Sequence, residues 1–273
     1  MVAAWYHCSM SIRETALPRS RTNQSLWRQL LRWLALAGLS IAFAVVIRTV
    51  VVGIYVIPTS SMEPTLVAGD VVLVSKLRYG PGLPPVIPLT DIVVTRPLRW
   101  WWKHPQRGDV VVFRFAYHAR YPSEPEYFVK RIVGEPGDTL WVEGDSLWLH
   151  LPRRRHTTPD QPYTGRVIVP MAGMTIPLDA GTIEYWRPFI EREGNTVDIV
   201  RKLVLINRES RTDYTFKHDY YYVLGDNRAR SFDSRWWGFV SSADIIGSPV
   251  LVLWSKSPAL GTFRWERIGT VPR

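Results

Sequence analysis

The sequence predicts a mostly β protein that carries a single N-terminal transmembrane helix. Two observations lead to this expectation. An apolar stretch from residue 33 to 57 is interrupted only at Arg48, and short β-rich runs separated by Gly, Pro and Asp follow residue 66. The 273 residues are 46% hydrophobic, which is enough for one large domain or two modest ones. The many aromatic residues argue against a disordered chain.

The chain is basic, with a net charge of +10. Such a balance is typical of proteins that meet nucleic acid or a membrane surface. Five arginines and one glutamate in residues 1–32, together with Arg48, account for half of the excess. The remainder forms no basic stripe with interleaved aromatics, so we expect no nucleic-acid partner. Cys8 is the single cysteine, which excludes an intrachain disulfide.

The apolar stretch predicts a retained membrane anchor. As a helix, residues 33–57 would extend about 37 Å at 1.5 Å per residue, against a bilayer core of about 30 Å. Arg48 would lie near one end, where its side chain can reach the headgroups. A cleaved signal peptide is disfavoured because no small-x-small site follows Ile47, and a buried core helix fits poorly with the basic flank. The positive-inside rule places residues 1–32 in the cytoplasm and everything after residue 57 outside.

The rest of the chain predicts antiparallel β structure. A short helix is expected over 181–193, while the Pro-rich segment 80–88 and the basic cluster 153–155 are interpreted as surface loops. A hairpin is expected within residues 139–150, with its turn at Glu-Gly-Asp. The expected strands are 70–77, 109–115, 126–134, 139–150, 198–206, 214–226 and 248–255.

The segment PTSSMEPTL, residues 58–66, places three hydroxyls in a row between two prolines. Such a run is common in turns, but it is also a candidate for a serine nucleophile, which would need a base. None of the six histidines lies in a stretch that resembles a catalytic triad. His218 is followed by Asp219, but adjacent residues of a strand face opposite sides, so we interpret it as structural.

A lysine is the alternative base, and Lys130 is the strongest candidate. On the expected strand 126–134 it shares a face with Phe128 and Ile132. A lysine acts as a base only when neutral, so its pKa must fall from about 10.4 toward about 7–8 through burial. The pattern alone leaves open a second interpretation, an edge-strand lysine whose amine reaches solvent.

Four ordered blocks carry a resemblance to bacterial type I signal peptidases. They are YVIPTSSMEPTLVAGD (55–70), RGDVVVF (107–113), YFVKRIVGEPGD (127–138) and GDNRARSFDSRWWGFV (225–240). The blocks cover about a fifth of the chain. The resemblance implies an antiparallel-β catalytic domain of the signal-peptidase type behind a membrane anchor, with a smaller β-rich subdomain inserted.

The resemblance assigns roles to the blocks. It implies that Ser61 is the nucleophile and Lys130 the general base. Thr59 and the backbone N–H of Ser61 would form the oxyanion hole. Family members often have Ser-Gly before the nucleophile where this chain has Thr59-Ser60, so Ser60 either shares the oxyanion role or shapes the turn. Ala229 replaces an Asp that many relatives carry, while the functional positions match.

The last block supplies the expected supporting residues. Ser231 matches the serine that hydrogen-bonds and orients the lysine. Asp226, Asp233, Arg131 and Arg235 match a salt-bridge network that braces the site.

The resemblance also implies an organisation. Residues 1–32 would be a basic cytoplasmic tail and 33–57 the anchor with a membrane-proximal strand. The catalytic core would comprise 58–142 and 214–273, the latter with a C-terminal tail, and 143–213 would be the inserted subdomain. The protein would cross the cytoplasmic (inner) membrane once, with its catalytic domain on the outer or periplasmic side.

The expected substrates are signal peptides of exported preproteins, cut after a small-x-small motif through an acyl-enzyme. The partners are membrane lipid and the export translocon, and neither a cofactor nor a metal is implied. Two alternatives remain open: a dedicated Ser/Lys processing enzyme with a narrow substrate range, and an inactive membrane-anchored protein that binds exported chains.

Overall fold

The computed structural model describes residues 21–82, 100–116, 126–143, 146–148 and 165–272. The chain divides into two compact units, Met1–Val45 and Val46–Arg273. The basic cluster 153–155, most of the Pro-rich segment 80–88 and the turn of the hairpin within 139–150 lie outside the described residues.

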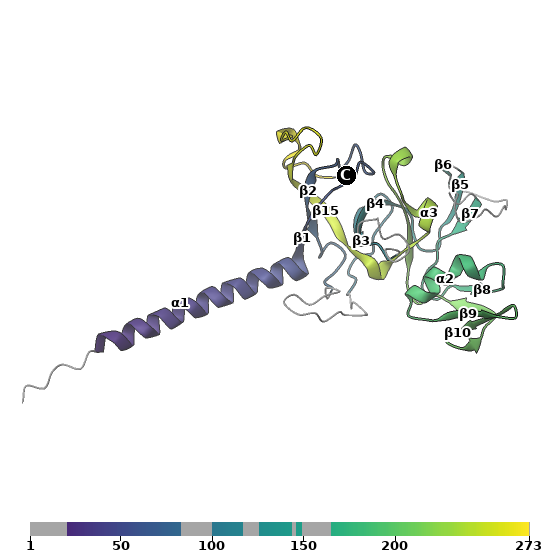
Figure 1. The fold of residues 1–273 in the computed structure, drawn as a ribbon, viewed down its shortest axis with the longest axis horizontal. Coiled ribbons are helices and arrows are strands. Elements are labelled where there is room, and N and C mark those ends of the chain that lie inside the picture. The colour runs from purple at the N-terminus through teal and green to yellow at the C-terminus, as the bar shows by residue number, and fades with distance from the viewer. Residues whose placement is uncertain (1–20, 83–99, 117–125, 144–145, 149–164, 273) are drawn as a thin grey trace, which may run out of the picture. The chain divides into compact units, whose positions relative to one another are not determined.

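The first described element is the helix α1, Arg21–Val46, which is continued by the π-helical turn η1, Ile47–Val51 (Figure 1). The segment Leu26–Val51 is long and apolar enough to cross a membrane. The helix therefore begins earlier than the expected anchor 33–57, and residues 52–56 are not helical. They form β1, because this β-branched run pairs antiparallel with β2.

The second unit is built on a seven-stranded sheet with the order β1-β2-β15-β3-β4-β13-β14. Every paired register in it is antiparallel, as expected from the sequence. The long C-terminal strand lies between two early strands, so distant parts of the chain meet at the centre. The bounds are β1 Val52–Val56, β2 Asp70–Ser75, β3 Val110–Arg114, β4 Tyr127–Gly134, β13 Tyr220–Leu224, β14 Val240–Ser241 and β15 Ile245–Ser255.

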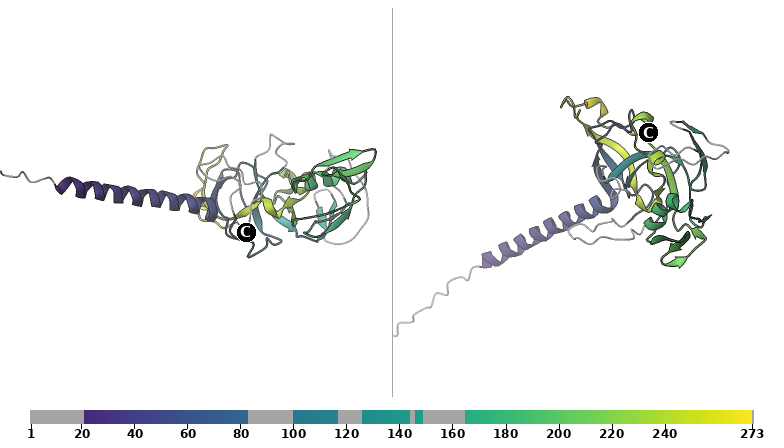
Figure 2. Two further views of the ribbon diagram at one scale, coloured as in Figure 1. Left: turned by 90° about the horizontal axis from the view of Figure 1, so that it is seen from below. Right: turned by 45° about the vertical axis from the view of Figure 1, so that its right-hand side comes forward.

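Three smaller antiparallel sheets and the helix α2, Ile183–Arg192, lie beside this sheet (Figure 2). They share a hydrophobic core that includes Leu140, Phe189 and Tyr220, so this core continues into β13 of the main sheet. The strands are β5 Thr139–Glu143, β6 Ser146–Trp148, β7 Gly165–Ile168, β8 Thr175–Pro177, β9 Val197–Val200, β10 Leu203–Ile206, β11 Glu209–Ser210 and β12 Asp213–Thr215.

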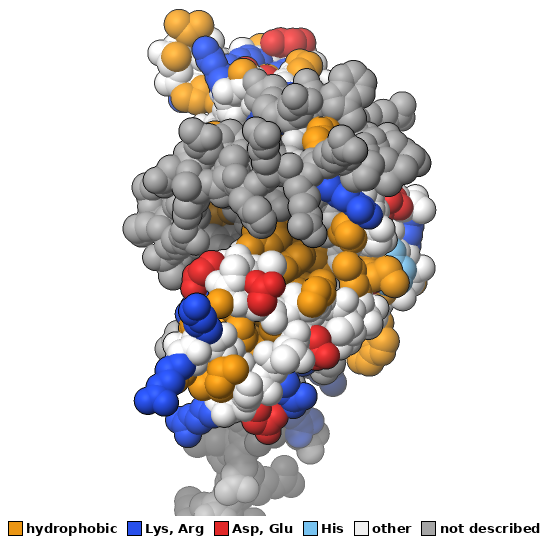
Figure 3. All heavy atoms as spheres, turned by 90° about the vertical axis from the view of Figure 1, so that its right-hand side faces the viewer, with side chains coloured by type: hydrophobic (Ala, Val, Ile, Leu, Met, Phe, Trp, Pro, Cys, Tyr) orange, Lys and Arg blue, Asp and Glu red, His pale blue; other side chains and the backbone are white. Residues whose placement is uncertain are grey.

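Figure 3 shows one face of the molecule, on which hydrophobic side chains gather at the centre and charged side chains of both signs lie around them. The remaining short helices are α3, Ser234–Trp237, and the 3-10 turns η2, Arg228–Arg230, η3, Ser242–Asp244, and η4, Trp265–Arg267.

Two expected strands are wrong in detail. Residues 198–206 form a hairpin instead of one strand, since Arg201 and Lys202 adopt positive φ angles of 48° and 71° and reverse the chain. Residues 214–226 are interrupted between β12 and β13, and His218 lies in this interruption rather than on a strand. Its backbone N–H donates to the buried Glu193 carboxylate at 3.1 Å, which agrees with a structural position.

Candidate active site

The hydroxyl stretch forms a tight loop between β1 and β2. The Ile57 N–H donates to the Asp70 carbonyl at the loop's base, at 2.8 Å. Within the loop, the Glu63 N–H donates to the Ser60 carbonyl at 3.1 Å. Met62 and Leu66 bury their side chains in a core cluster below it. The buried anchors and the turn hydrogen bonds hold Ser61 in place, and only 7% of that residue is exposed.

Lys130 reaches this loop from the middle of β4. Its Nζ donates a hydrogen bond to the Ser61 Oγ at 2.8 Å, across 69 residues of sequence. The residue is 4% exposed, and its Nζ lies 5.1 Å from the centroid of the Phe128 ring. Since β4 lies between β3 and β13, Lys130 is on an interior strand. The interpretation of an edge-strand lysine that reaches solvent is therefore wrong.

Alternation along β4 explains the placement. Phe128, Lys130 and Ile132 are buried, whereas the residues between them are half-buried. The same alternation directs Arg131 to the opposite face, where it meets a different set of partners. The strand β4 therefore supplies both the buried amine of Lys130 and, on its opposite face, the Arg131 side chain that binds other segments of the site.

The other two hydroxyls of the loop behave differently. The exposed Thr59 donates its Oγ1–H to the Ser61 Oγ at 3.3 Å. Among the described residues, Ser60 makes no side-chain hydrogen bond, and its carbonyl supports the turn. The Ser61 carbonyl in turn accepts from the Asn227 N–H at 3.1 Å, which ties this loop to the last sequence block.

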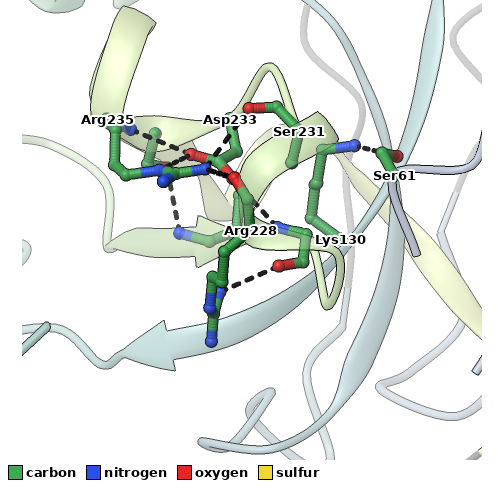
Figure 4. A network of polar contacts seen from close by, with 9 residues as sticks. Ser61, Lys130, Arg228, Ser231, Asp233 and Arg235 are labelled. Carbon is green, nitrogen blue, oxygen red and sulfur yellow. Dashed lines mark hydrogen bonds and ion pairs between the residues drawn. The ribbon is translucent and has the colours of Figure 1, made fainter. Parts of the chain in front are cut away.

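Ser231 does not make the expected hydrogen bond to Lys130. Its Oγ is buried and has no hydrogen-bond partner among the described residues. In Figure 4 its hydroxyl is turned away from the lysine amine, whose bond to Ser61 is drawn. A Cβ added to Gly225 would lie 2.3 Å from the Ser231 Oγ and 2.4 Å from the Ser61 carbonyl oxygen, so close packing requires glycine here.

Arg131 and Asp226 form one of the expected ion pairs. The Arg131 Nε and Nη2 donate to the two Asp226 oxygens at 2.8 and 2.7 Å. Thr65 also donates to Asp226, at 2.6 Å. Burial alone would raise the pKa of the Asp226 carboxyl, but the hydrogen bonds from Arg131 and Thr65 outweigh burial and hold this pKa below its usual value. The pair thus joins β4, the hydroxyl loop and the last block.

Asp233 and Arg235 form a second, more deeply buried pair (Figure 4). Asp233 is fully buried, and its oxygens accept from the Arg235 Nε at 2.9 Å and the Gly225 N–H at 3.1 Å. Arg235 also donates to the Arg228 carbonyl at 2.6 Å. The four charged residues therefore form two separate ion pairs, which the segment 225–228 connects.

A pocket is lined by Ser61, Lys130 and Thr59, and its other lining residues are mainly apolar and aromatic. Tyr55 and Tyr127 meet edge to face with their ring centroids 5.6 Å apart. Burial, with a smaller contribution from Tyr127, raises the pKa of Tyr55 to about 12. The lining residues are Tyr55, Val56, Pro58, Thr59, Ser61, Met62, Val112, Tyr127, Phe128, Val129, Lys130, Arg230 and Phe232.

The arrangement places a hydroxyl, an amine and a second hydroxyl donor together in the lining of a largely apolar pocket. This set can perform acyl transfer without further groups. In the part of the chain that the structure describes, no three His, Cys, Asp or Glu side chains are placed to hold a metal ion. Sequence reasoning missed Thr65, Gly225 and the pocket aromatics, because their contacts join segments distant in sequence.

The family model and the curated relatives agree on one family. A family model described as signal peptidase, peptidase S26, matches residues 30–254. A signal peptidase I of Pseudomonas aeruginosa is 32% identical over 244 residues, covering 83% of this chain and 74% of that protein. A signal peptidase I of Leptolyngbya laminosa is 30% identical over 224 residues, covering 80% of this chain and 76% of that protein. A solved signal peptidase I from Enterococcus faecalis V583 covers 54% of this chain and 97% of its own, at 23% identity and a TM-score of 0.24.

Proposed function

Because this chain belongs to the signal peptidase family, peptidase S26, we propose that it is a membrane-bound serine endopeptidase that removes signal peptides from exported preproteins. The observation that carries this proposal is the buried hydrogen bond of 2.8 Å between the Lys130 Nζ and the Ser61 Oγ, two residues that line the same pocket. A nucleophile and base within this distance meet the first requirement of covalent catalysis.

In the proposed reaction Lys130 is the general base. Loss of hydration on burial disfavours the charged ammonium and favours the neutral amine, and Lys130 is 4% exposed. Its Nζ takes the Ser61 Oγ proton while Oγ bonds to the carbonyl carbon at the end of the signal peptide. The tetrahedral intermediate collapses as the peptide C–N bond breaks, and the new amino terminus leaves with the proton from Lys130. Water then attacks the acyl carbon while Lys130 takes a proton from the water, and the ester bond to the Ser61 Oγ breaks as Lys130 returns that proton to Oγ.

The oxyanion would be held by the Ser61 backbone N–H and the Thr59 hydroxyl. Thr59 already lies 3.3 Å from the Ser61 Oγ, so a rotation of its side chain would direct Oγ1–H at the oxygen of the attacked carbonyl. Ser231 would act as a positioning residue after a rotation of its side chain toward Lys130, because its buried hydroxyl has no hydrogen-bond partner among the described residues. The two ion pairs would fix the geometry of both segments.

Thr59→Val should lower kcat by about 10²–10³-fold with little change in KM, because one oxyanion donor contributes this much to the transition state alone. The measurement is steady-state cleavage of a preprotein in detergent. Thr59→Ser keeps the hydroxyl and is the matched control, which should retain most of the activity. Equal rates for Thr59→Val and wild type would show that the Thr59 hydroxyl does not stabilise the oxyanion.

The proposal extends to substrate and location. We propose cleavage after a small-x-small motif, action beside the export translocon, and a single-pass orientation with residues 1–32 in the cytoplasm. The helix α1 and the family membership support anchoring in the membrane. The exposed Ile54 and Val56 on β1 give the strand that leads into Ser61 an apolar surface suited to membrane-anchored substrates.

The test is cleavage of a generic preprotein by the full chain in detergent, followed by N-terminal sequencing of the product. A new N-terminus directly after a small-x-small site would support the general signal peptidase. Cleavage of only one dedicated substrate would favour the narrow processing enzyme, and a folded chain that cuts nothing would favour the binding protein.

A further inference from the structure

Arg230 lies on the wall of the pocket that contains Ser61 and Lys130. It is the last residue of the 3-10 turn η2 and directly precedes Ser231. Its backbone is fixed by a hydrogen bond from its N–H to the Asn227 carbonyl at 3.1 Å, while its side chain is exposed. The turn therefore presents a cation at a defined point beside the candidate nucleophile.

The Arg230 guanidinium makes no hydrogen bond or ion pair with any residue that the structure describes. The neighbouring arginines are engaged, since Arg228 donates to the Gly225 carbonyl at 2.9 Å and Arg235 binds Asp233. Arg230 is thus not part of the network that braces the site, and its five N–H donors are available to a ligand.

The electrostatic surroundings favour an anion at this position. None of the residues that line the pocket is acidic. The guanidinium is a cation, whereas Lys130 must be neutral to act as a base. Most of the lining is apolar or aromatic, and the attraction between opposite charges is stronger beside such walls than in bulk water. The exposed Glu126 lies next to Tyr127 and acts on its phenol, but it is not in the lining.

We propose that Arg230 binds the carboxylate of an Asp or Glu side chain of the preprotein near the cleaved bond, so that the enzyme prefers preproteins with an acidic residue there. This inference rests on the proposed function, because the bound peptide is the substrate of the same site. The planar guanidinium suits a carboxylate particularly well, since it donates two parallel hydrogen bonds to its oxygens. Arg230 is then a specificity-determining residue and takes no part in the bond-making steps.

The experiment uses a series of peptides that share a small-x-small site and differ at one position. Gln is placed in turn at the second position before the cut and at each of the three positions after it, so that the small residues at the first and third positions before the cut are kept, and each peptide is paired with its Glu counterpart. For wild type, kcat/KM should be roughly twofold to fivefold higher for Glu than for Gln at one position, the range expected of a partly exposed ion pair. The preference should weaken with added salt. Arg230→Gln should abolish it, and Arg166→Gln, an exposed arginine on β7, should keep it.

Charge reversal gives a second variant. Arg230→Glu should favour Lys over Gln at the position where wild type favours Glu. The inference is overturned if no position shows a preference for Glu that depends on Arg230, or if Arg230→Gln slows all peptides equally. The Gln member of each pair separates this result from the proposed function, because its cleavage by wild type requires the catalytic residues but no ion pair with Arg230. If wild type cleaves neither member of any pair, the proposed function itself is wrong, and the role inferred for Arg230 falls with it.

Discussion

Ser61→Ala and Lys130→Met should each lower kcat/KM for a preprotein by at least about 10⁴-fold, because a nucleophile and its base act as a unit. Without the Ser61 Oγ no acyl-enzyme forms. Without the Lys130 amine, whose Nζ lies 2.8 Å from the Ser61 Oγ, nothing accepts the hydroxyl proton. The double variant should be hardly slower than either single one. The measurement is the rate of product formation in detergent, with the product identified by its N-terminus.

Two matched variants control this result. Ser60→Ala removes the adjacent hydroxyl, which makes no hydrogen bond within the described chain, and should retain most of the activity because the Ser60 carbonyl still closes the turn. Lys103→Met removes an exposed lysine and should behave as wild type. A Lys130→Met variant with normal activity would show that the base is another group. An inactive Ser60→Ala variant would show that the Ser60 hydroxyl takes part in the reaction.

The pH profile separates the base from a purely structural lysine. The ammonium form of Lys130 cannot accept a proton, so kcat should rise with pH until the amine is neutral. Burial favours the neutral form, so this rise should lie below the range in which an exposed lysine titrates. A flat profile with chemistry rate-limiting would contradict a lysine base.

Strand positions were predictable because they follow from the local alternation of apolar and polar residues. The period of two along residues 127–134 places Lys130 on the buried face, and burial on β4 follows that pattern residue by residue. The apolar stretch and its basic flank likewise predicted a long N-terminal helix, which the structure contains as α1. The helix α2 was expected within one or two residues of its actual bounds.

The contacts between segments were not predictable from periodicity. The Thr65 hydroxyl reaches Asp226 across 161 residues, and no local pattern encodes such a meeting. The hairpin turn at Arg201 and Lys202 lacks the Gly or Asn that usually marks it, so its residues resembled the middle of a strand. The orientation of the Ser231 hydroxyl is a side-chain rotamer, and motif resemblance does not determine it.

Removal of one partner of the buried pair of Asp233 and Arg235 should strongly destabilise the catalytic unit. Asp233→Ala leaves the Arg235 charge buried without its carboxylate, and removal of one partner of such a pair typically costs about 3–5 kcal/mol in the free energy of unfolding. The measurement is chemical unfolding in detergent. Glu209→Ala is the matched control, since it breaks the Glu209–Arg211 pair, whose side chains are 69% and 56% exposed, and should cost far less.

Asp233→Ala should also lower activity, because it removes the hydrogen bond that holds Gly225 beside the nucleophile. Asp233 accepts the Gly225 N–H at 3.1 Å, and Gly225 packs directly against the Ser61 carbonyl and Ser231. Release of Gly225 would displace the nucleophile, and an error of about 1 Å can cost about 10²-fold in rate. The double variant Asp233→Ala/Arg235→Met removes the buried charge and should recover part of the stability but not the rate. If it recovers both, the pair contributes to folding alone, and the Gly225 segment does not depend on it for its position.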